Sequence, residues 1–252
     1  AVAKSFAALI PAVLTLSIFT ALNAIVTGAF NTNLHDVIYN VIQMPLVGLG
    51  SSIWATLIAI FFIQFLWFFG LHGQILVNSV MDPIWNTLMY DNLDAYKAGE
   101  HIPHIISKPF METFTVGLGG SGMTLAVVII MAFIMKKKQY RDVGRLALGA
   151  GIFNVNEPVI FGLPIVLNAT ILIPWVISPI IVTALNYFVM AIGLVPAPTG
   201  VSVPWTVPVF FSGIIATNSL AGGLLQIIDC LIVGFIWLPF LHMLDKQPDS
   251  AL

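Results

Sequence analysis

Charge is what this chain has least of. Only 8% of its 252 residues are Asp, Glu, Lys or Arg, whereas 59% are hydrophobic. A soluble globular domain carries about 25% charged residues, so this composition excludes an ordinary water-facing surface. Several apolar stretches exceed the roughly 20 residues that span a bilayer. They do not alternate in the short segments of a membrane barrel. The sequence therefore predicts an all-α integral membrane protein.

Other scarcities exclude further classes of protein. The single cysteine, Cys230, rules out an internal disulfide and stands in an apolar run, which favours a packing role. A net charge of −2, with nine scattered basic residues, argues against a nucleic-acid partner. The sequence has no metal-ligand spacing, Walker lysine or nucleophile elbow. We therefore expect neither a metal nor a cofactor.

Hydropathy predicts about six transmembrane helices, one interfacial amphipathic helix and two re-entrant hairpins. The predicted spans are residues 6–30, 46–71, 73–90, 115–135, 170–194 and 219–243, of which 73–90 is the shortest and most polar. The amphipathic helix follows from apolar residues spaced one helical turn apart between residues 34 and 44. Residues 91–114 hold most of the charge and fit either a solvent loop or an ordered hairpin.

The same pattern predicts how the chain is organised. It opens without an initiator methionine or a signal-peptide pattern, which we interpret as a fragment of a longer protein. Residues 1–30 would be the last span of a truncated amino-terminal domain, and residues 31–45 the interfacial linker helix. Residues 46–245 would form the transport domain, and residues 246–252 a cytoplasmic tail.

One basic cluster predicts the orientation in the membrane. Five of the ten residues from 136 to 145 are basic: Lys136, Lys137, Lys138, Arg141 and Arg145. Such clusters mark cytoplasmic loops. If residues 73–90 cross the membrane, Lys4 and Lys246 also face the cytoplasm. If they do not, Lys4 and the 34–44 helix exchange sides.

Prolines interrupt the apolar region from residue 149 to residue 208, which contains eight of them. Broken helices at membrane depth need protein or water around their freed carbonyls, and transporters use them to build midplane sites. We predict a re-entrant hairpin at 146–168, entered from the cytoplasm. Residues 196–217 would be a structured outer loop or a partial re-entry.

Glu157 is the one acidic, basic or histidine residue between Arg145 and Asp229. A buried carboxylate is costly unless it is paired, so it is either a protonated or capping residue, or an acceptor for a polar substrate. The surrounding letters "NVNEP" favour the second reading, because Asn154 and Asn156 supply amides and Pro158 breaks the helix.

Two weaker signals accompany Glu157. His72 stands between glycines in "FFGLHGQ", where an interfacial histidine and a functional one fit equally well. The stretch "GLGGSGMT" at 117–124 could offer backbone N–H groups to a ligand. Close packing of small residues between helices would explain the same letters.

Several motifs in order resemble one known family. The stretches "AVAKSFAALIPA", "FGLHG", "PHIISKPFMETF", "GLGGSG", "GIFNVNEPVIFGLP", "VPWTVPVFFSG" and "LDKQ" cover nearly the whole chain. Together they resemble the membrane component, enzyme IIC, of bacterial sugar phosphotransferase systems, in the lactose/cellobiose/diacetylchitobiose branch. The resemblance covers the carboxyl-terminal part of such a component.

The resemblance implies group translocation by a multi-pass protein of the bacterial cytoplasmic membrane. A sugar, by the habit of the branch a β-linked disaccharide, would bind near the midplane and receive phosphate from a phosphocysteine on a separate cytoplasmic IIB protein. Cys230 matches no phosphorylation motif, so whether this component itself counts as an enzyme stays open. The full-length protein would be a homodimer in lipid.

The resemblance also assigns residues. It implies that Glu157 and His72 contact the hydroxyl that receives the phosphate. Further sugar contacts would come from Asn92, His104, Lys108, Gly119, Gly120, Ser121, Asn154 and Asn156. The basic cluster, Lys136 to Arg145, would form part of the surface that docks IIB.

Two other classes of function remain open at this stage. An ion-coupled secondary transporter would carry a proton on Glu157 or Asp82. A membrane scaffold or receptor would bind without transport. Transport assays separate the first from group translocation, because proton coupling needs a pH gradient and group translocation needs phosphorylated IIB.

Overall fold

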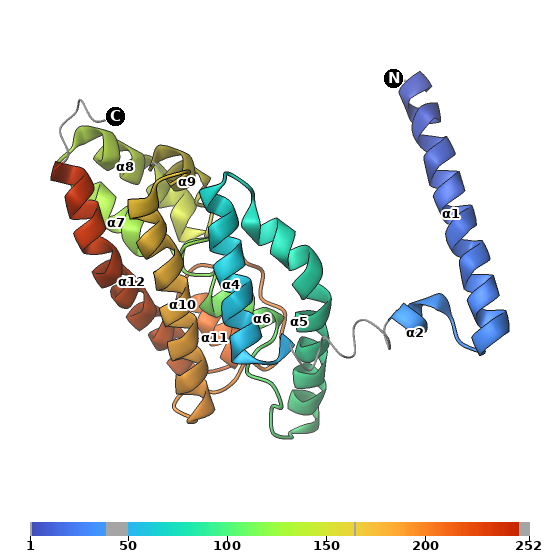
Figure 1. Ribbon diagram of the computed structural model, residues 1–252. Helices are drawn as coiled ribbons and strands as arrows, with labels where there is room; N and C mark the ends of the chain where they lie inside the picture. Colours follow the sequence, from blue (N-terminus) through green and yellow to red (C-terminus); the bar gives the residue numbers. More distant parts are fainter. Residues whose placement is uncertain (1, 39–49, 164, 247–252) are drawn as a thin grey trace. The chain divides into compact units, whose positions relative to one another are not determined.

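The computed structural model describes residues 2–38, 50–163 and 165–246, and these contain helices, turns and loops but no strand. The chain divides into two compact units, residues 1–48 and 49–252. Figure 1 labels the helices of each unit. The prediction of an all-α membrane protein is confirmed.

The first unit contains α1 (Val2–Phe30) and α2 (Leu34–Ile38). Helix α1 is long and apolar enough to cross a membrane, as predicted for residues 6–30, and it contains Pro11. Helix α2 begins with a capping contact in which the side chain of Asn33 accepts a hydrogen bond from the Asp36 N–H at 2.8 Å. Residues 39–44 of the predicted amphipathic helix lie outside the described residues.

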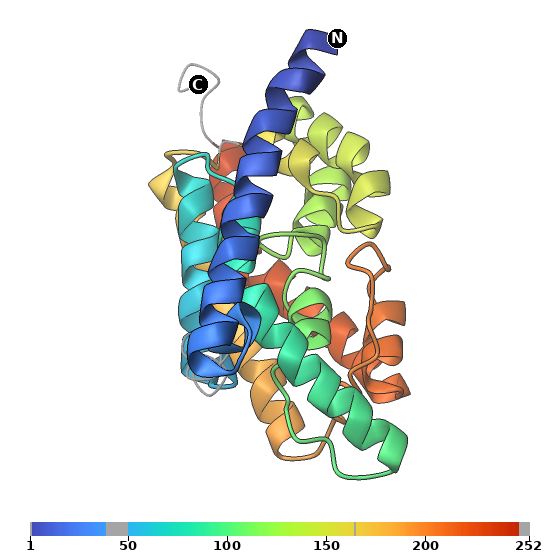
Figure 2. The same ribbon diagram turned by 90° about the vertical axis from the view of Figure 1, so that its right-hand side faces the viewer.

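The second unit holds the remaining described helices, seen from two sides in Figures 1 and 2. They are α4 (Ile53–Phe68), α5 (Gly73–Ala98), α6 (Lys108–Phe114), α7 (Leu125–Phe133), α8 (Lys138–Ile152), α9 (Glu157–Gly162), α10 (Ala169–Ala191), α11 (Phe211–Thr217) and α12 (Leu220–Lys246).

Helices α10 and α12 are the long apolar helices of this unit, and each is long enough to cross a membrane. Helix α10 packs against α4 and α12. Trp175 and Trp237 meet edge to face in this core, with ring centroids 6.5 Å apart, and both are fully buried. The predicted spans at 170–194 and 219–243 are confirmed as helices. The total of six spans stays a prediction.

Residues 115–135 do not form one span, which corrects the sequence prediction. Helix α7 begins only at Leu125, because the preceding glycines turn the chain. Gly119, Gly120 and Gly122 have φ angles of 102°, 85° and 78°, a region that favours glycine and breaks a helix. The segment is a buried turn followed by a short helix.

Two other predicted boundaries shift. Residues 91–98 belong to α5, which continues to Ala98 and ends at Gly99 with a φ of 72°. The basic cluster is largely helical rather than a loop, since α8 begins at Lys138.

Helices α8 and α9 pack on each other around a turn at residues 153–156, the shape expected of a hairpin. Its entry into the membrane stays a prediction.

Buried amide side chains satisfy the carbonyls that the short helix α6 leaves open. The Gln226 side chain of α12 donates to the carbonyl of Thr113 at 2.8 Å. Asn186 of α10 donates to the carbonyl of Phe114 at 3.2 Å and to the carboxylate of Asp229 at 2.9 Å. Open carbonyls inside a membrane protein cost several kcal/mol each. These two amides therefore hold the end of α6 against both long helices.

The turn before α7 generates a stability prediction. A Cβ atom at Gly122 would lie 2.5 Å from the Trp175 ring, on a backbone with φ of +78°. Gly122→Ala should destabilise the protein by about 2–4 kcal/mol, from left-handed strain plus overpacking. Thermal unfolding of the purified protein in detergent measures the effect.

Gly149→Ala is the matched control, because nothing lies within 4 Å of its added Cβ and the residue is inside α8. Its melting temperature should equal or exceed that of the wild type. Equal melting of the two variants would contradict the packing assigned to Gly122.

Candidate functional site

A cavity of 290 Å³ lies where the interrupted segments of the second unit meet. Its walls come from the end of α4, the first turns of α5, α6, the glycine turn and the start of α9. The lining residues are Trp67, His72, Gln74, Ile75, Asn78, Glu112, Val116, Gly120, Ser121, Asn154, Asn156, Glu157 and Trp205. Two carboxylates, two tryptophans and several amides and hydroxyls therefore share one cavity.

Asn154 fixes the turn between α8 and α9. Its φ of 63° lies in the left-handed region, which asparagine tolerates better than most residues. Its amide nitrogen donates to the carbonyls of Trp205 and Val207, at 2.6 and 3.0 Å. Its amide oxygen accepts the Gly119 N–H at 2.8 Å. One side chain thus joins three segments around the cavity.

Asn156 joins the glycine turn to the start of α9. Its amide nitrogen donates to the carbonyl of Ser121 at 2.6 Å. A Cβ at Gly120 would come within 2.7 Å of both the Asn156 side chain and the Asn154 carbonyl. Only glycine allows this approach together with a φ of +85°.

Glu157 is the first residue of α9, follows Asn156 directly and faces the cavity. Its side chain is exposed, and among the described residues it has no hydrogen-bond or ion-pair partner. The side chain therefore lies outside the core, and it makes no capping contact with a backbone N–H of the described residues. The carboxylate is free to accept hydrogen bonds from a ligand.

His72 caps the start of α5. Its Nδ1 accepts the Ile75 N–H at 3.4 Å, and its ring lies 4.5 Å from that of Trp67 between centroids. With Nδ1 acting as acceptor, the proton of the neutral ring stands on Nε2. His72 lines the cavity, and with Nδ1 already accepting, Nε2 is the ring nitrogen that remains to donate to a ligand.

Two polar side chains one turn apart on α5, Gln74 and Asn78, line the cavity and were not predicted as site residues. Gln74 donates to Asn78 at 3.1 Å and accepts from Ser121 at 3.3 Å. Asp82 continues the same helical face. The signal was the spacing of four residues, which places 74, 78 and 82 in one row.

Glu112 also lines the cavity and was not predicted as a site residue. Its carboxylate lines the cavity and pairs with Lys108 at 2.6 Å. Lys108 also binds Asp82 at 2.7 Å, so one ammonium group bridges α5 and α6. Its side chain is 20% exposed and that of Glu112 only 14%. Lys108 itself does not line the cavity, which differs from the predicted sugar contact. It holds Glu112 in the cavity wall.

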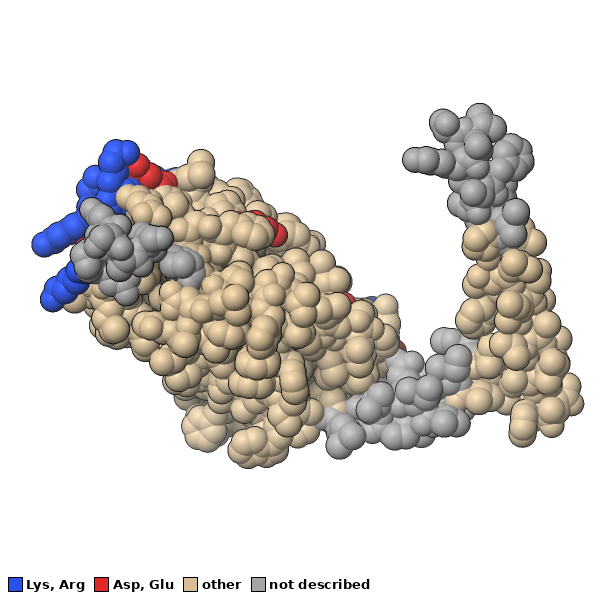
Figure 3. All heavy atoms as spheres, turned by 45° about the horizontal axis from the view of Figure 1, so that its top comes forward, with Lys and Arg blue, Asp and Glu red and all other residues tan. Residues whose placement is uncertain are grey.

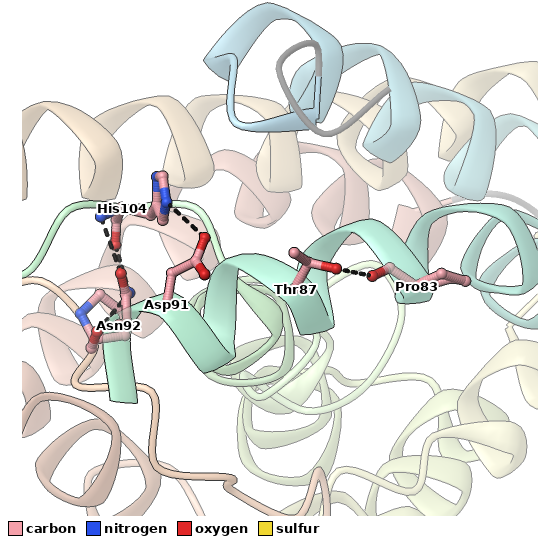
Figure 4. Close-up of polar contacts among 6 residues, drawn as sticks. Pro83, Thr87, Asp91, Asn92 and His104 are labelled. Atoms are coloured by element: carbon pink, nitrogen blue, oxygen red, sulfur yellow. Dashed lines mark hydrogen bonds and ion pairs between the residues drawn. The ribbon is translucent and has the colours of Figure 1, made fainter. Parts of the chain in front are cut away.

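Six of the expected sugar-site residues line the cavity: His72, Gly120, Ser121, Asn154, Asn156 and Glu157. Gly119 stands behind them and donates to Asn154. Asn92 and His104 do not line the cavity, and Figure 4 shows the hydrogen bonds that join them to each other. The buried Asn92 side chain binds the backbone of His104, at 2.7 and 3.0 Å, and the carbonyl of Pro198. Its polar atoms are used to fasten loops.

A larger cavity of 470 Å³ lies near the carboxyl ends of α5 and α10. Its polar side chains mostly bind the protein itself. Asn218 donates to the Tyr96 hydroxyl at 2.8 Å, and Thr217 donates to the carbonyl of Gly213 at 2.8 Å. Its lining contains no carboxylate. Although it is larger, this cavity is chemically less suited to a polar ligand than the one at Glu157.

Figure 3 shows lysine and arginine side chains gathered at one end of the second unit. The Asp245 carboxylate accepts the backbone N–H groups of Lys136 and Lys137 at 2.9 and 2.7 Å. Lys138 pairs with Asp142, and this hydrogen bond lowers the pKa of the carboxyl group. The basic cluster is therefore an ordered surface next to the end of α12.

Comparison with known proteins identifies the family. Residues 1–179 match the family described as "Phosphotransferase system, EIIC". The oligo-beta-mannoside-specific EIIC component of Bacillus subtilis (strain 168) is 65% identical over 246 residues, which are 98% of this chain and 56% of that protein. The cellobiose-specific EIIC component of Geobacillus stearothermophilus is 38% identical over 98% of this chain and 55% of its own length.

A solved structure agrees. The crystal structure of the transporter ChbC, the IIC component from the N,N'-diacetylchitobiose-specific phosphotransferase system, superposes with a TM-score of 0.85 and 39% identity. The match covers 97% of this chain and 56% of that one. The chain thus spans about half the length of the relatives it matches. It belongs to the EIIC family, the membrane components of the phosphotransferase system.

Proposed function

We propose that this chain is the sugar-binding part of a IIC permease, which carries a β-linked oligosaccharide to a phosphorylated IIB partner. The observation that carries the proposal is the cavity in which Glu157 and His72 meet. They stand 85 positions apart in the sequence, yet both reach this space.

The lining suits a sugar. Each hydroxyl that leaves water needs a hydrogen-bond partner. The carboxylates of Glu157 and Glu112, the His72 ring and the amides of Gln74 and Asn78 supply such partners. Trp67 and Trp205 add flat apolar faces, against which the C–H groups of a sugar ring pack. No net positive charge faces the cavity, which fits a neutral substrate.

The relatives support the class of sugar. The names of the similar proteins specify oligo-beta-mannoside and cellobiose, and that of the similar structure specifies N,N'-diacetylchitobiose. These are β-linked oligosaccharides. We propose the same class for this chain, in a homodimer formed by the full-length protein.

The geometry of the cavity supports a role in phosphorylation for Glu157 and another for His72. Phosphoryl transfer depends mainly on positioning and charge stabilisation. Glu157, which has no partner among the described residues, would accept the proton of the attacking hydroxyl. His72 would donate from Nε2 and hold the hydroxyl in place. Proton-coupled transport through Asp82 is less well supported, because Lys108 occupies that carboxylate at 2.7 Å.

Replacing Glu157 tests the central assignment. In the full-length protein, Glu157→Gln keeps the size of the side chain and some hydrogen bonding but removes the proton acceptor. Sugar should still bind, several-fold more weakly, whereas phosphorylation should fall at least a hundredfold. Binding by isothermal titration and phosphorylation by IIB in vesicles measure the two effects. If IIB phosphorylates sugar bound to this variant at the wild-type rate, the carboxylate is not the proton acceptor and its role is structural.

Replacing Lys108 tests the missed residue Glu112. Lys108→Gln removes the bridge and leaves Asp82 and Glu112 without their cation. The Lys108→Gln variant should bind sugar about tenfold more weakly than the wild type, and so should Glu112→Gln. Both changes disturb the same hydrogen-bond acceptor in the cavity wall. Lys97→Gln, at the exposed end of α5, is the control and should bind like the wild type. If the Lys108→Gln and Glu112→Gln variants bind sugar with the affinity of the wild type, the proposed role of Glu112 as a sugar contact is wrong.

The basic cluster provides a test of IIB docking. Reversing the charge of Lys138, Arg141 and Arg145 together should weaken phosphorylation at limiting IIB, while sugar binding stays within about twofold. The effect should shrink as salt rises, because exposed charges are screened. If the triple variant gives the wild-type rate of sugar phosphorylation at low salt and limiting IIB, the cluster does not dock IIB and only sets the orientation of the chain in the membrane.

A further inference from the structure

A cleft of 250 Å³ opens between the end of α7 and the last two turns of α12. It is separate from the sugar cavity and shares no lining residue with it. One part of its wall is apolar and includes Ile130, Ile134 and Leu238. The other part is polar and includes Lys136, His242 and Lys246.

A pair of backbone contacts sets the polar end of the cleft. Because Asp245 accepts the N–H groups of Lys136 and Lys137, the chain leaving α7 is fixed beside the last turn of α12. Lys136 and Lys246, which are 110 positions apart, therefore line the same cleft, and both side chains are exposed. The one carboxylate in the lining, Asp245, already has two N–H partners.

The apolar end of the cleft faces outward. Ile134 is 61% exposed and Leu238 is 41% exposed. Helix α12 is long and apolar enough to span a membrane, and Leu238 lies about two turns before its charged end. In a membrane spanned by α12, the charged end of the cleft would lie toward the polar surface and its apolar end toward the hydrocarbon.

We propose that this cleft binds an anionic phospholipid, with the headgroup phosphate between Lys136 and Lys246 and an acyl chain along Ile134 and Leu238. Basic pockets between transmembrane helices on the cytoplasmic side hold lipid phosphates in this way. A free phosphate ion would use the two lysines but would gain nothing from the apolar wall. The combination of both walls favours a lipid.

The site has a structural consequence. A bound lipid would bridge α7 and α12 next to the basic cluster, at the end of the molecule where the IIB surface is proposed. Lipid binding nevertheless requires neither IIB nor sugar. The two proposals are therefore tested separately.

Native mass spectrometry of the purified full-length protein in detergent tests the site. The protein is titrated with phosphatidylglycerol and, separately, with phosphatidylcholine of the same chains. Phosphatidylglycerol should bind at least fivefold more tightly. Lys136→Gln and Lys246→Gln should each lower its affinity about fivefold. Lys138→Gln, a neighbouring lysine outside the cleft, is the matched control and should bind like the wild type.

Two further arms separate the sources of phosphate and exclude misfolding. Inorganic phosphate should not displace the lipid, and Leu238→Ser should weaken lipid binding while leaving the melting temperature within a few degrees of the wild type. Equal binding of both lipids would overturn the proposal, as would an equal loss in Lys138→Gln or displacement by inorganic phosphate.

Discussion

Backbone groups inside a membrane protein must find partners within the protein, and the architecture of the second unit depends on how it meets this demand. Every helix leaves its terminal backbone groups without an intrahelical partner, and in α6, α7, α9 and α11, of six to nine residues, these are most of the backbone groups. Asn154, Asn186 and Gln226 supply the missing partners, and each binds backbone groups of segments far away in sequence. Their burial is therefore structural, and it is what allows the chain to break repeatedly at membrane depth.

Because these amide side chains are occupied by backbone groups, they also determine which polar groups remain available to a ligand. Both N–H groups of the Asn154 amide donate to the carbonyls of Trp205 and Val207, and its oxygen accepts the Gly119 N–H. Glu157, three residues further on, has no hydrogen-bond or ion-pair partner in the part of the chain that the structure describes. Gln226, Asn186 and Asp229 are buried in the helix interface and form a support behind α6. The side chains that stay available are those nearest the breaks.

The sequence predicted a structural feature correctly where a single physical property determined that feature. Length and hydropathy predicted α1, α10 and α12, and the isolated charge of Glu157 predicted its place at a break. The 115–135 span was wrong because hydropathy is blind to backbone conformation: Gly119, Gly120 and Gly122 are as apolar as a helix needs, yet their positive φ angles form a turn. Glu112 was missed because its role arises from Lys108 and Asp82, a contact between helices that spacing along one chain does not reveal.

The partners of the charged side chains also differ between the cavity at Glu157 and the cleft at the end of α12. No ammonium group lines the cavity at Glu157, because Lys108 lies outside the lining and pairs with the carboxylates of Asp82 and Glu112. At the end of α12 the cleft lining holds one carboxylate, Asp245, which accepts two backbone N–H groups and stays charged, and two lysines, Lys136 and Lys246. The balance of charged side chains in each lining thus decides which sign each surface presents. The cavity at Glu157 presents carboxylate acceptors, and the end of α12 presents an excess of lysines.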